Sequence, residues 1–435
     1  MSGDDPQRDA RDSGAVAALR YRNFRLLWGG LVVTSIGSWM MQFGLGWLTV
    51  DLAVRAGTPS LGPLFLGLAG LARVIPGVLF GLAAGVIADR MDRRLVLAFS
   101  QALGAVVAAL LAVLVLTDQI TIVWVMVGSA LASTSNAFDV PTRQAFMPRL
   151  VPPRAFMSAL GLVSSAITAS MLLGPLVGGL LIGPIGVGGI MVVNAASYLP
   201  ILAAIAALPR IAPAPGAARA SILRSLGEGL GYVRREPAVR MTLVLVGSAT
   251  VFGRAVQGVL PAVANDPLHV GAVELSWLMG ASGAGALVGS LTVTMLGGVR
   301  RRGILLTAML MIEGAIVVLF ALQRDVLPAA LLIAPFSACS MVLVGMSNAI
   351  SQTRPPDRLR ARVLSVHVLI VQSGLPLGTL VVGSLMTVVG STPALALAGA
   401  TVAIVGAAAL LREPAIREYD STTPQGPAAE RAGIA

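Results

Sequence analysis

The stretch GVIADRMDRR, residues 85–94, joins two long apolar runs and concentrates acidic and basic side chains between them. Each flanking run is long enough to cross a bilayer as a helix, which takes about 20 apolar residues. A cluster of arginines in a short loop between two such helices marks the cytoplasmic side, because basic loops are retained there. This one stretch therefore predicts an integral membrane protein and fixes the orientation of two of its helices.

The composition supports a membrane protein. The 435 residues are 56% hydrophobic and 12% charged, and the mean hydropathy is +0.85. A net charge of +11 would suggest nucleic acid as a partner of a soluble protein, but here the basic residues, all arginine, lie in short loops between apolar runs. We therefore expect a lipid bilayer and no nucleic acid as partner. Cys339 is the single cysteine, so no intrachain disulfide can form, and the polar first twenty residues predict no cleavable signal peptide.

Apolar segments of membrane-spanning length recur along the whole chain, and none alternates like a barrel strand. In lipid the backbone must satisfy its own hydrogen bonds, so the fold class is all-α. We predict twelve transmembrane helices, at 24–50, 61–88, 95–116, 120–138, 157–183, 186–208, 240–262, 272–298, 303–322, 327–352, 363–389 and 391–411.

The arginines test this division. Only Arg55 and Arg324 fall in loops on the predicted external side, and Arg73 and Arg254 fall inside spans. All the others lie at the two ends of the chain or in loops on the opposite side. This bias predicts that both termini are cytoplasmic and that the spans are even in number.

The longest internal connection divides the spans six and six. We expect a disordered cytoplasmic N-terminus at 1–20, a first six-helix half at 21–208, a cytoplasmic linker at 209–239, a second half at 240–411 and a disordered cytoplasmic tail at 412–435. Within the linker, residues 223–232 could form an amphipathic surface helix. The sequences of the two halves show a weak parallel repeat. In this repeat the position of the second half that corresponds to Asp89 is a glycine, Gly297.

A chain of six plus six helices with both ends inside resembles the major facilitator superfamily. Gly85, Asp89, Arg90, Arg93 and Arg94 match that superfamily's motif between helices 2 and 3. The resemblance implies that Asp89 accepts hydrogen bonds from a helix N-terminus while the arginines hold the two halves together on the inner side. The alternative is that the arginines only anchor the topology.

A second match lies in the fifth span, where Gly174, Pro175, Gly178 and Gly179 reproduce the end of the superfamily's antiporter motif. Ser170 replaces its earlier glycine. Proline removes a helix hydrogen bond and glycines allow close packing, so this helix could bend and seal one side against leakage. The motif favours export, and generic small-residue packing is the alternative.

Shorter passages are similar to the bacterial branch that contains the enterobactin exporter and macrolide efflux proteins, also described as transmembrane secretion effectors. They are residues 20–28, 138–151 and 356–363. The first is a basic, aromatic entry to helix 1, and the others follow helices 4 and 10. By this resemblance Arg143 belongs to the inner gate.

Ionisable residues inside a span are costly and need a reason. Arg73 and Arg254 lie midway along spans, and with Ser38, Gln42 and Gln257 they are candidate substrate contacts. The alternative is internal pairing, for instance of Arg254 with Glu313. Candidate proton-coupling groups are Asp51, Glu313 and His367, each with a structural alternative as a solvated helix end or a packed side chain.

We therefore predict a secondary transporter of the plasma (inner) membrane of a bacterium. It would export a small organic compound, such as a siderophore, an antibiotic or another amphiphilic molecule, by alternating access and proton antiport. The alternatives are an importer or symporter of a small metabolite and a non-transporting sensor or scaffold on the same fold. The chain carries no constellation of a metal site or a catalytic nucleophile and no P-loop, so we expect no enzyme activity, metal or cofactor.

Overall fold

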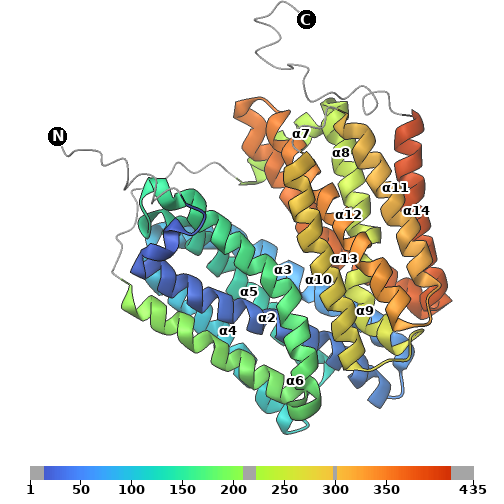
Figure 1. Ribbon diagram of the computed structural model, residues 1–435, viewed down its shortest axis with the longest axis horizontal. Coiled ribbons are helices and arrows are strands. Elements are labelled where there is room, and N and C mark those ends of the chain that lie inside the picture. Colours follow the sequence, from blue (N-terminus) through green and yellow to red (C-terminus); the bar gives the residue numbers. More distant parts are fainter. Residues whose placement is uncertain (1–13, 209–221, 297–300, 413–435) are drawn as a thin grey trace, which may run out of the picture. The chain divides into compact units, whose positions relative to one another are not determined.

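The structure is a computed structural model that describes residues 14–208, 222–296 and 301–412, without the side chains of Val78, 81–90 and 222–226 (Figure 1). The described residues form helices and no strand. They divide into two units by their internal packing. The first contains the described residues up to Leu52 and from Ala72 to 208. The second contains Ala53–Leu71 and the described residues from 222 onward, so that the division falls within two helices, once after Leu52 and once after Leu71.

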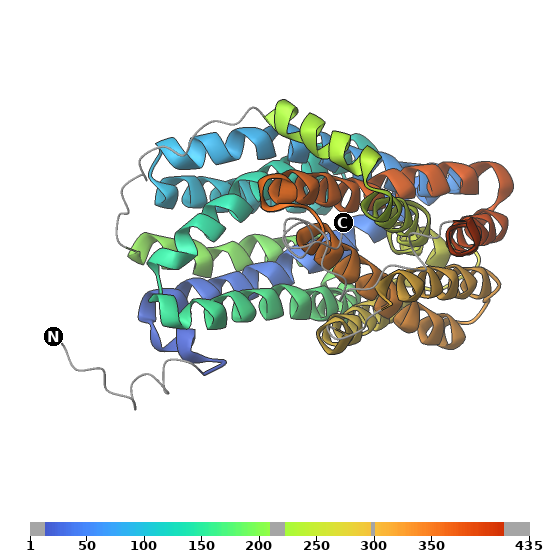
Figure 2. The ribbon, with the colours of Figure 1, turned by 90° about the horizontal axis from the view of Figure 1, so that it is seen from above.

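The first unit begins with a short 3₁₀ helix, η1 (Ala17–Arg20). Its long helices lie side by side in Figure 2. They are α2 (Arg22–Arg55), the later part of α3 (Gly62–Arg90), α4 (Arg93–Leu116), α5 (Ile122–Phe146) and α6 (Phe156–Ala207), with 3₁₀ turns η3 (Met147–Arg149) and η4 (Pro153–Ala155) between the last two. Helix α4 packs against both α5 and α6.

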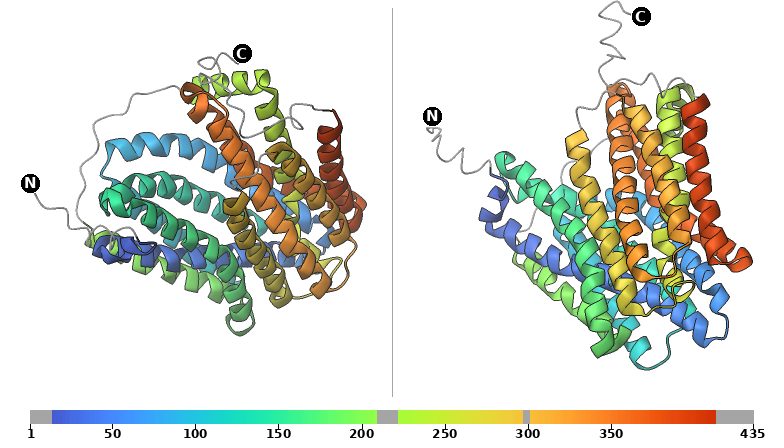
Figure 3. Two further views of the ribbon diagram at one scale, coloured as in Figure 1. Left: turned by 45° about the horizontal axis from the view of Figure 1, so that its top comes forward. Right: turned by 45° about the vertical axis from the view of Figure 1, so that its right-hand side comes forward.

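The second unit contains η2 (Pro59–Leu61), the first part of α3 and a series of helices whose long members run alongside one another in Figure 3. These are α7 (Ile222–Arg235), α8 (Pro237–Ser248), a π-helical turn η5 (Ala249–Gly253), α9 (Ala255–Asn265), α10 (Ala272–Met295), α11 (Arg302–Ala321), α12 (Val326–Thr353), α13 (Asp357–Val389) and α14 (Ser391–Arg412). Helix α12 packs against both α10 and α11, and α14 covers α11.

Ten helical segments of the described chain are long and apolar enough to cross a membrane. One of them, Pro153–Ala207, contains two predicted spans that meet at Gly186, whose φ of 66° is in the left-handed region that glycine tolerates. Each predicted span falls on helical backbone in the part of the chain that the structure describes. The all-helical, multi-pass fold is therefore confirmed, and the count of twelve crossings with both termini inside stays a prediction.

The sequence sets several helix ends. The Asp92 side chain caps α4 by accepting a hydrogen bond from the Arg94 backbone N–H at 3.0 Å. Thr121 caps α5, and Glu274 accepts from the Gly271 N–H at the start of α10. Such caps satisfy backbone donors that the first helical turn leaves without partners. They keep the connections short, and Met91 and Asp92 alone separate α3 from α4.

Two expected boundaries differ from the structure. Residues 17–20, which we expected to be disordered, form η1, because Ala17 and Ala18 are buried and the Ser158 hydroxyl lies between the Ala18 N–H (3.2 Å) and the Ala15 carbonyl (2.8 Å). The predicted linker at 209–239 contains α7 and the first turn of α8, which Pro237 starts. The predicted surface helix is confirmed as a helix and is longer than expected. The expected disorder at 1–13 and 413–435 lies outside the described residues.

Candidate transport site and gate

The end of the 85–94 motif binds helix C-termini inside the first unit. Arg93 is buried and its Nη1 donates to the carbonyl of Ala145 at 2.9 Å, near the end of α5. Arg94 donates to the carbonyl of Ala206, near the end of α6. Cationic side chains stabilise the exposed carbonyls and the negative end of the dipole at helix C-termini. These contacts of the two arginines tie α4 to its own neighbours, and the expected role of the arginines in holding the two halves together stays a prediction.

The earlier part of the motif lies in the last turns of α3. Gly85, Asp89 and Arg90 belong to this helix, and their side chains fall outside the described ones. The predicted acceptor role of Asp89 at a helix N-terminus therefore stays a prediction. The described cap of α4 is Asp92, a residue for which we made no such prediction.

The predicted gate residue Arg143 forms a buried ion pair within α5. Its Nη2 lies 3.2 Å from Oδ2 of Asp139, one turn earlier on the same helix. The other oxygen of Asp139 accepts a hydrogen bond of 2.6 Å from Nε2 of Gln101 on α4. The Nε and Nη1 atoms of Arg143 have no hydrogen-bond partner among the described residues. The guanidinium thus keeps donors for a further group, and Gln101 is a member of this cluster that sequence reasoning missed.

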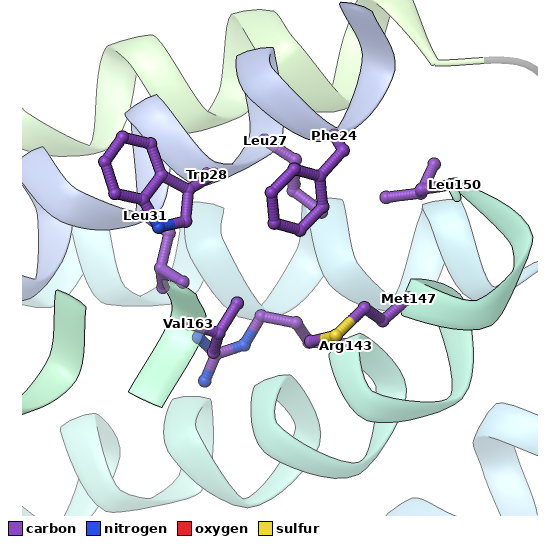
Figure 4. A pocket seen from close by; sticks show the side chains of 8 residues that line it. All are labelled: Phe24, Leu27, Trp28, Leu31, Arg143, Met147, Leu150 and Val163. Atoms are coloured by element: carbon purple, nitrogen blue, oxygen red, sulfur yellow. The ribbon is translucent and has the colours of Figure 1, made fainter. Parts of the chain in front are cut away.

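Arg143 also lines a small apolar pocket in the first unit. Figure 4 shows its side chain running past Met147 toward Val163, below Trp28 of α2. The remaining lining residues are Phe24, Leu27, Leu31 and Leu150. The aromatic entry to helix 1 and the segment after helix 4, which we singled out separately in the sequence, therefore meet around one arginine. Trp28 is fixed there by a hydrogen bond of 3.0 Å from its indole N–H to the Leu162 carbonyl.

The antiporter-like segment packs closely against α2. A Cβ atom at Gly174 would lie 2.4 Å from Cβ of Trp39, and one at Gly178 would lie 2.7 Å from Cδ1 of Phe43. Gly174, Pro175, Gly178 and Gly179 are all buried. Contacts this short exclude any larger residue unless the helices separate. The structure thus gives these glycines a packing role, and a sealing role stays a prediction.

Three candidate substrate contacts belong to the first unit. Ser38 Oγ is 3.5 Å from the hydroxyl of Tyr198 on α6, and Gln42 is half-buried one turn further along α2. Arg73 is half-buried on α3, where its carbonyl accepts a hydrogen bond of 2.6 Å from Ser133. Tyr198 is a polar side chain in the interior of this unit that the sequence reasoning did not single out.

The other two candidate substrate contacts belong to the second unit. Nε2 of Gln257 donates to Ser282 Oγ at 3.0 Å and Ser337 Oγ at 3.2 Å, and the two hydroxyls are 2.8 Å apart. Gln257 thereby joins α9 to α10 and α12. Arg254 is half-buried at the junction of the π-helical turn and α9 and interacts electrostatically with Glu313.

The three proton-coupling candidates have different surroundings. Asp51 is half-buried near the end of α2 and takes part in a polar or electrostatic interaction. His367 on α13 is 2% exposed, and neither of its ring nitrogens has a hydrogen-bond partner in the described parts of the chain. Glu313 on α11 is 0% exposed, and both carboxylate oxygens equally lack such a partner. The two groups within spans are therefore the ones whose burial needs an explanation.

Helix α7 and Glu236, which follows it directly and precedes α8, are held to the second unit by two ion pairs that sequence reasoning missed. Glu228 pairs with Arg362 on α13, and Glu236 Oε1 lies 3.2 Å from Arg354 Nε at the end of α12. Burial raises the pKa of the neighbouring Tyr232, and the Glu236 carboxylate raises it further against the opposing effect of Arg354. Tyr232 therefore stays neutral at physiological pH. The sequence does show that arginines are frequent around α7 and after α12, which indicates that ion pairs could form there. It does not show which acidic residue each arginine contacts, because spacing along one chain does not reveal that.

Comparison with known proteins assigns the family. The family model of transmembrane secretion effectors matches residues 13–430. Macrolide efflux protein A of Streptococcus pyogenes is 24% identical over 307 residues, which are 68% of this chain and 73% of that protein. The enterobactin exporter EntS of Shigella boydii is 24% identical over 344 residues, which are 79% of this chain and 82% of the exporter.

A solved structure shares the fold. A bacterial homologue of the human lysosomal transporter Spinster, in an inward-facing and unoccupied conformation, aligns with a TM-score of 0.70 at 15% identity. The match covers 92% of this chain and 98% of that one. With the family match over nearly its whole length, the chain belongs to the transmembrane secretion effectors of the major facilitator superfamily, a family of multi-pass bacterial membrane transporters.

Proposed function

We propose that this protein is a secondary exporter of a small amphiphilic organic compound in the bacterial inner membrane. The observation that carries the proposal is the family match over residues 13–430, together with relatives that are named for efflux of macrolides and export of enterobactin. The antiporter-like segment of α6, in close contact with α2 at Gly174 and Gly178, supports the same direction. The proposed mechanism is alternating access, in which twelve spans in two halves expose a central site to each side in turn.

Within this proposal Ser38, Gln42, Arg73, Arg254 and Gln257 are substrate contacts. The two arginines are the strongest of them, because a half-buried guanidinium within an apolar span can attract an anionic group of a substrate. Gln257 donates its amide hydrogens to two serines, so its contribution is to hold the other groups in place. The gate consists of the 85–94 motif, the Asp139–Arg143 pair and the α2–α6 contact.

Energy would come from a proton gradient in an antiport cycle. Two buried titratable groups within spans, Glu313 and His367, support this choice, because each could gain or lose a proton when the access of water changes. The alternatives are uptake of a metabolite with protons and a sensor or scaffold without transport. A shared fold does not give a direction of transport, so direction rests on the efflux-named relatives and the α6 segment.

Purified protein in liposomes tests the proposal. A labelled macrolide and labelled enterobactin serve as probes, and accumulation is measured with a pH gradient of either sign and without one. We expect accumulation only when protons can move against the probe. Arg254→Ala should lower the apparent affinity for a transported probe, and transport by this variant at normal rate and affinity would remove Arg254 from the site. Uptake driven in the same direction as protons would support the symporter, and no transport of a broad compound panel would support the scaffold.

A further inference from the structure

Glu313 is a buried acid of the second unit whose electrostatic cost is unexplained. It lies in the middle of α11, is completely buried, and has no hydrogen bond to either carboxylate oxygen from the described residues. A buried carboxylate without partners is unstable by several kcal/mol, and such a group becomes neutral or acquires a partner instead. In the arrangement seen here, the carboxyl group fits its surroundings as the protonated acid.

The helix that faces Glu313 is irregular at the point of contact. Residues Ala249–Gly253 form a π-helical turn, closed by a hydrogen bond of 2.7 Å from the Arg254 N–H to the Ala249 carbonyl. A Cβ atom at Gly253 would lie 2.4 Å from Oε1 of Glu313. The carboxyl group therefore occupies the space beside a glycine in the wide turn. Single π turns inside α-helices are rare and occur frequently at functional sites.

The charged and titratable groups around Glu313 are few. Arg254, at the end of the π turn, and Cys339, on α12, both interact with it electrostatically. The Ser340 hydroxyl, also on α12, is buried and lies close enough to act on the Glu313 carboxyl group, although no hydrogen bond of normal geometry joins them in the described residues. Helix α14 carries only Arg412, at its last residue, and α8 carries only Arg240, which is exposed near its start. Arg254 is thus the one cation placed to respond to a charge on Glu313 within the described unit.

We propose that Glu313 is a proton-binding site whose charge state controls the π-helical turn at Ala249–Gly253. This inference rests on the proposed proton coupling and names its site. When water reaches the carboxyl group, its O–H bond breaks, the proton passes to water and the electron pair remains on the carboxylate. Arg254 keeps its charge and moves toward the new carboxylate, which draws the end of the π turn across Gly253.

That movement has a consequence for α9. Removing or shifting the extra residue of a π turn rotates the following helical residues by about 100°, the angle per residue of an α-helix. Gln257, which joins α9 to Ser282 and Ser337, lies one turn beyond Arg254. Deprotonation would therefore re-orient a polar group that faces α10 and α12. The protonation state of Glu313 and the orientation of α9 would then change together.

Infrared difference spectroscopy tests the proton site without a substrate. Purified full-length protein in liposomes is titrated, and the carbonyl stretch of protonated carboxyl groups is followed in H₂O and in D₂O. We expect a band that shifts in D₂O and disappears in Glu313→Gln. Glu274→Gln removes an acid from the start of α10 and should leave the band unchanged. If Glu313→Gln fails to fold, Glu313→Asp should shift the band. If the carboxyl band of the wild type is the same in the Glu313 variants, the proposal is overturned.

A matched pair of glycine variants tests the contact with the π turn. Gly253→Ala should shift the Glu313 band, because the added methyl group occupies the place of Oε1. Gly247→Ala on the same helix adds a methyl group at an ordinary distance of 3.5 Å from Ile370 and should leave the band unchanged. The protection factors of residues 249–258, which are exchange rates divided into the intrinsic rates at the same pH, should change with pH in the wild type and stay constant in Glu313→Gln. Retained dependence in the variant would show that Glu313 does not control the turn.

These measurements separate the two proposals. A band that requires Glu313, together with no proton-driven transport of either probe, would retain the proton site and reject the exporter. Proton-driven transport that persists in Glu313→Gln, with no band assigned to Glu313, would retain the exporter and reject this site.

Discussion

Arg143 lies one turn after Asp139 on α5, its Nη2 3.2 Å from the Asp139 Oδ2, and both side chains are buried. Gln101 completes the arrangement from α4. The pair lies within one helix, so it cannot by itself join two helices. Its effect is to hold the guanidinium of Arg143 in the pocket between α2 and α5 (Figure 4), with two donors still available.

Asp139→Asn should be strongly destabilising. It leaves the Arg143 cation buried without a counter-charge, and loss of one partner of a buried ion pair costs about 3–5 kcal/mol. Thermal unfolding of the detergent-solubilised protein measures the effect. The matched control is Asp357→Asn, which breaks an exposed pair with Arg360 and should change stability by less than about 1 kcal/mol. Equal melting temperatures for the two variants would contradict the role of Asp139.

Gly174→Ala should separate α6 from α2. The added Cβ would approach Trp39 Cβ to 2.4 Å and the Ile36 carbonyl to 3.0 Å, and backbone atoms cannot yield as a flexible side chain does. Overpacking of this kind costs about 1–3 kcal/mol. Gly183→Ala on the same helix meets no atom within 4 Å and should be neutral or slightly stabilising. Unfolding temperatures and the rate of probe efflux measure both variants, and a Gly174→Ala protein as stable and active as Gly183→Ala would reject the close contact.

The ion pair between Glu236 and Arg354 should hold α7 to the end of α12. Arg354→Glu places two carboxylates together and should raise the rate of amide exchange in residues 227–235. The exchanged pair Glu236→Arg with Arg354→Glu should restore protection, because the attraction is re-formed with its direction reversed. Arg360→Glu alters an exposed arginine near the start of α13 and serves as the control. Protection that the double variant fails to restore would assign the effect to packing.

The sequence predicted the helical segments well because bilayer thickness and backbone hydrogen bonding leave few choices for long apolar runs. It also placed a boundary between residues 183 and 186, and in the structure two helical segments meet at a kink at Gly186, which has a left-handed backbone conformation. Partners were harder to predict. Nothing in the spacing shows that Gln101 reaches Asp139 or that Glu228 reaches Arg362, because these contacts depend on how distant helices rotate against each other.

The candidate site shows the same limit. Glu313 was recognisable as an acid inside an apolar run, whereas its contact with Gly253 depends on a π turn that no local sequence signal predicts. Arg93 and Arg94 were recognisable as a basic cluster, but the carbonyls that they bind, at Ala145 and Ala206, are more than fifty residues away along the chain. Backbone acceptors carry no signature of their own in a sequence.

Asp89→Asn should impair conformational switching more than substrate binding. By the family motif Asp89 accepts hydrogen bonds from a helix N-terminus, and replacement of its carboxylate by a neutral amide weakens a charge-assisted bond of about 1.5–3 kcal/mol. The altered balance between states should lower the turnover of a transported probe by about tenfold or more, since 1.4 kcal/mol corresponds to a factor of ten. Equilibrium binding of the same probe should stay within error of the wild type.

Asp92→Asn is the control for that variant. Asp92 caps α4 through the Arg94 N–H, and asparagine is about as good an N-cap as aspartate, so stability and turnover should both be retained. The two residues lie three positions apart in the same motif, which makes a general effect of lost negative charge visible as an equal change in both variants. Unchanged turnover with weakened binding in Asp89→Asn would move this residue from the gate to the substrate site. The distinction matters because Gly297 replaces the acid in the second half, so any switch that Asp89 operates acts on one side of the repeat alone.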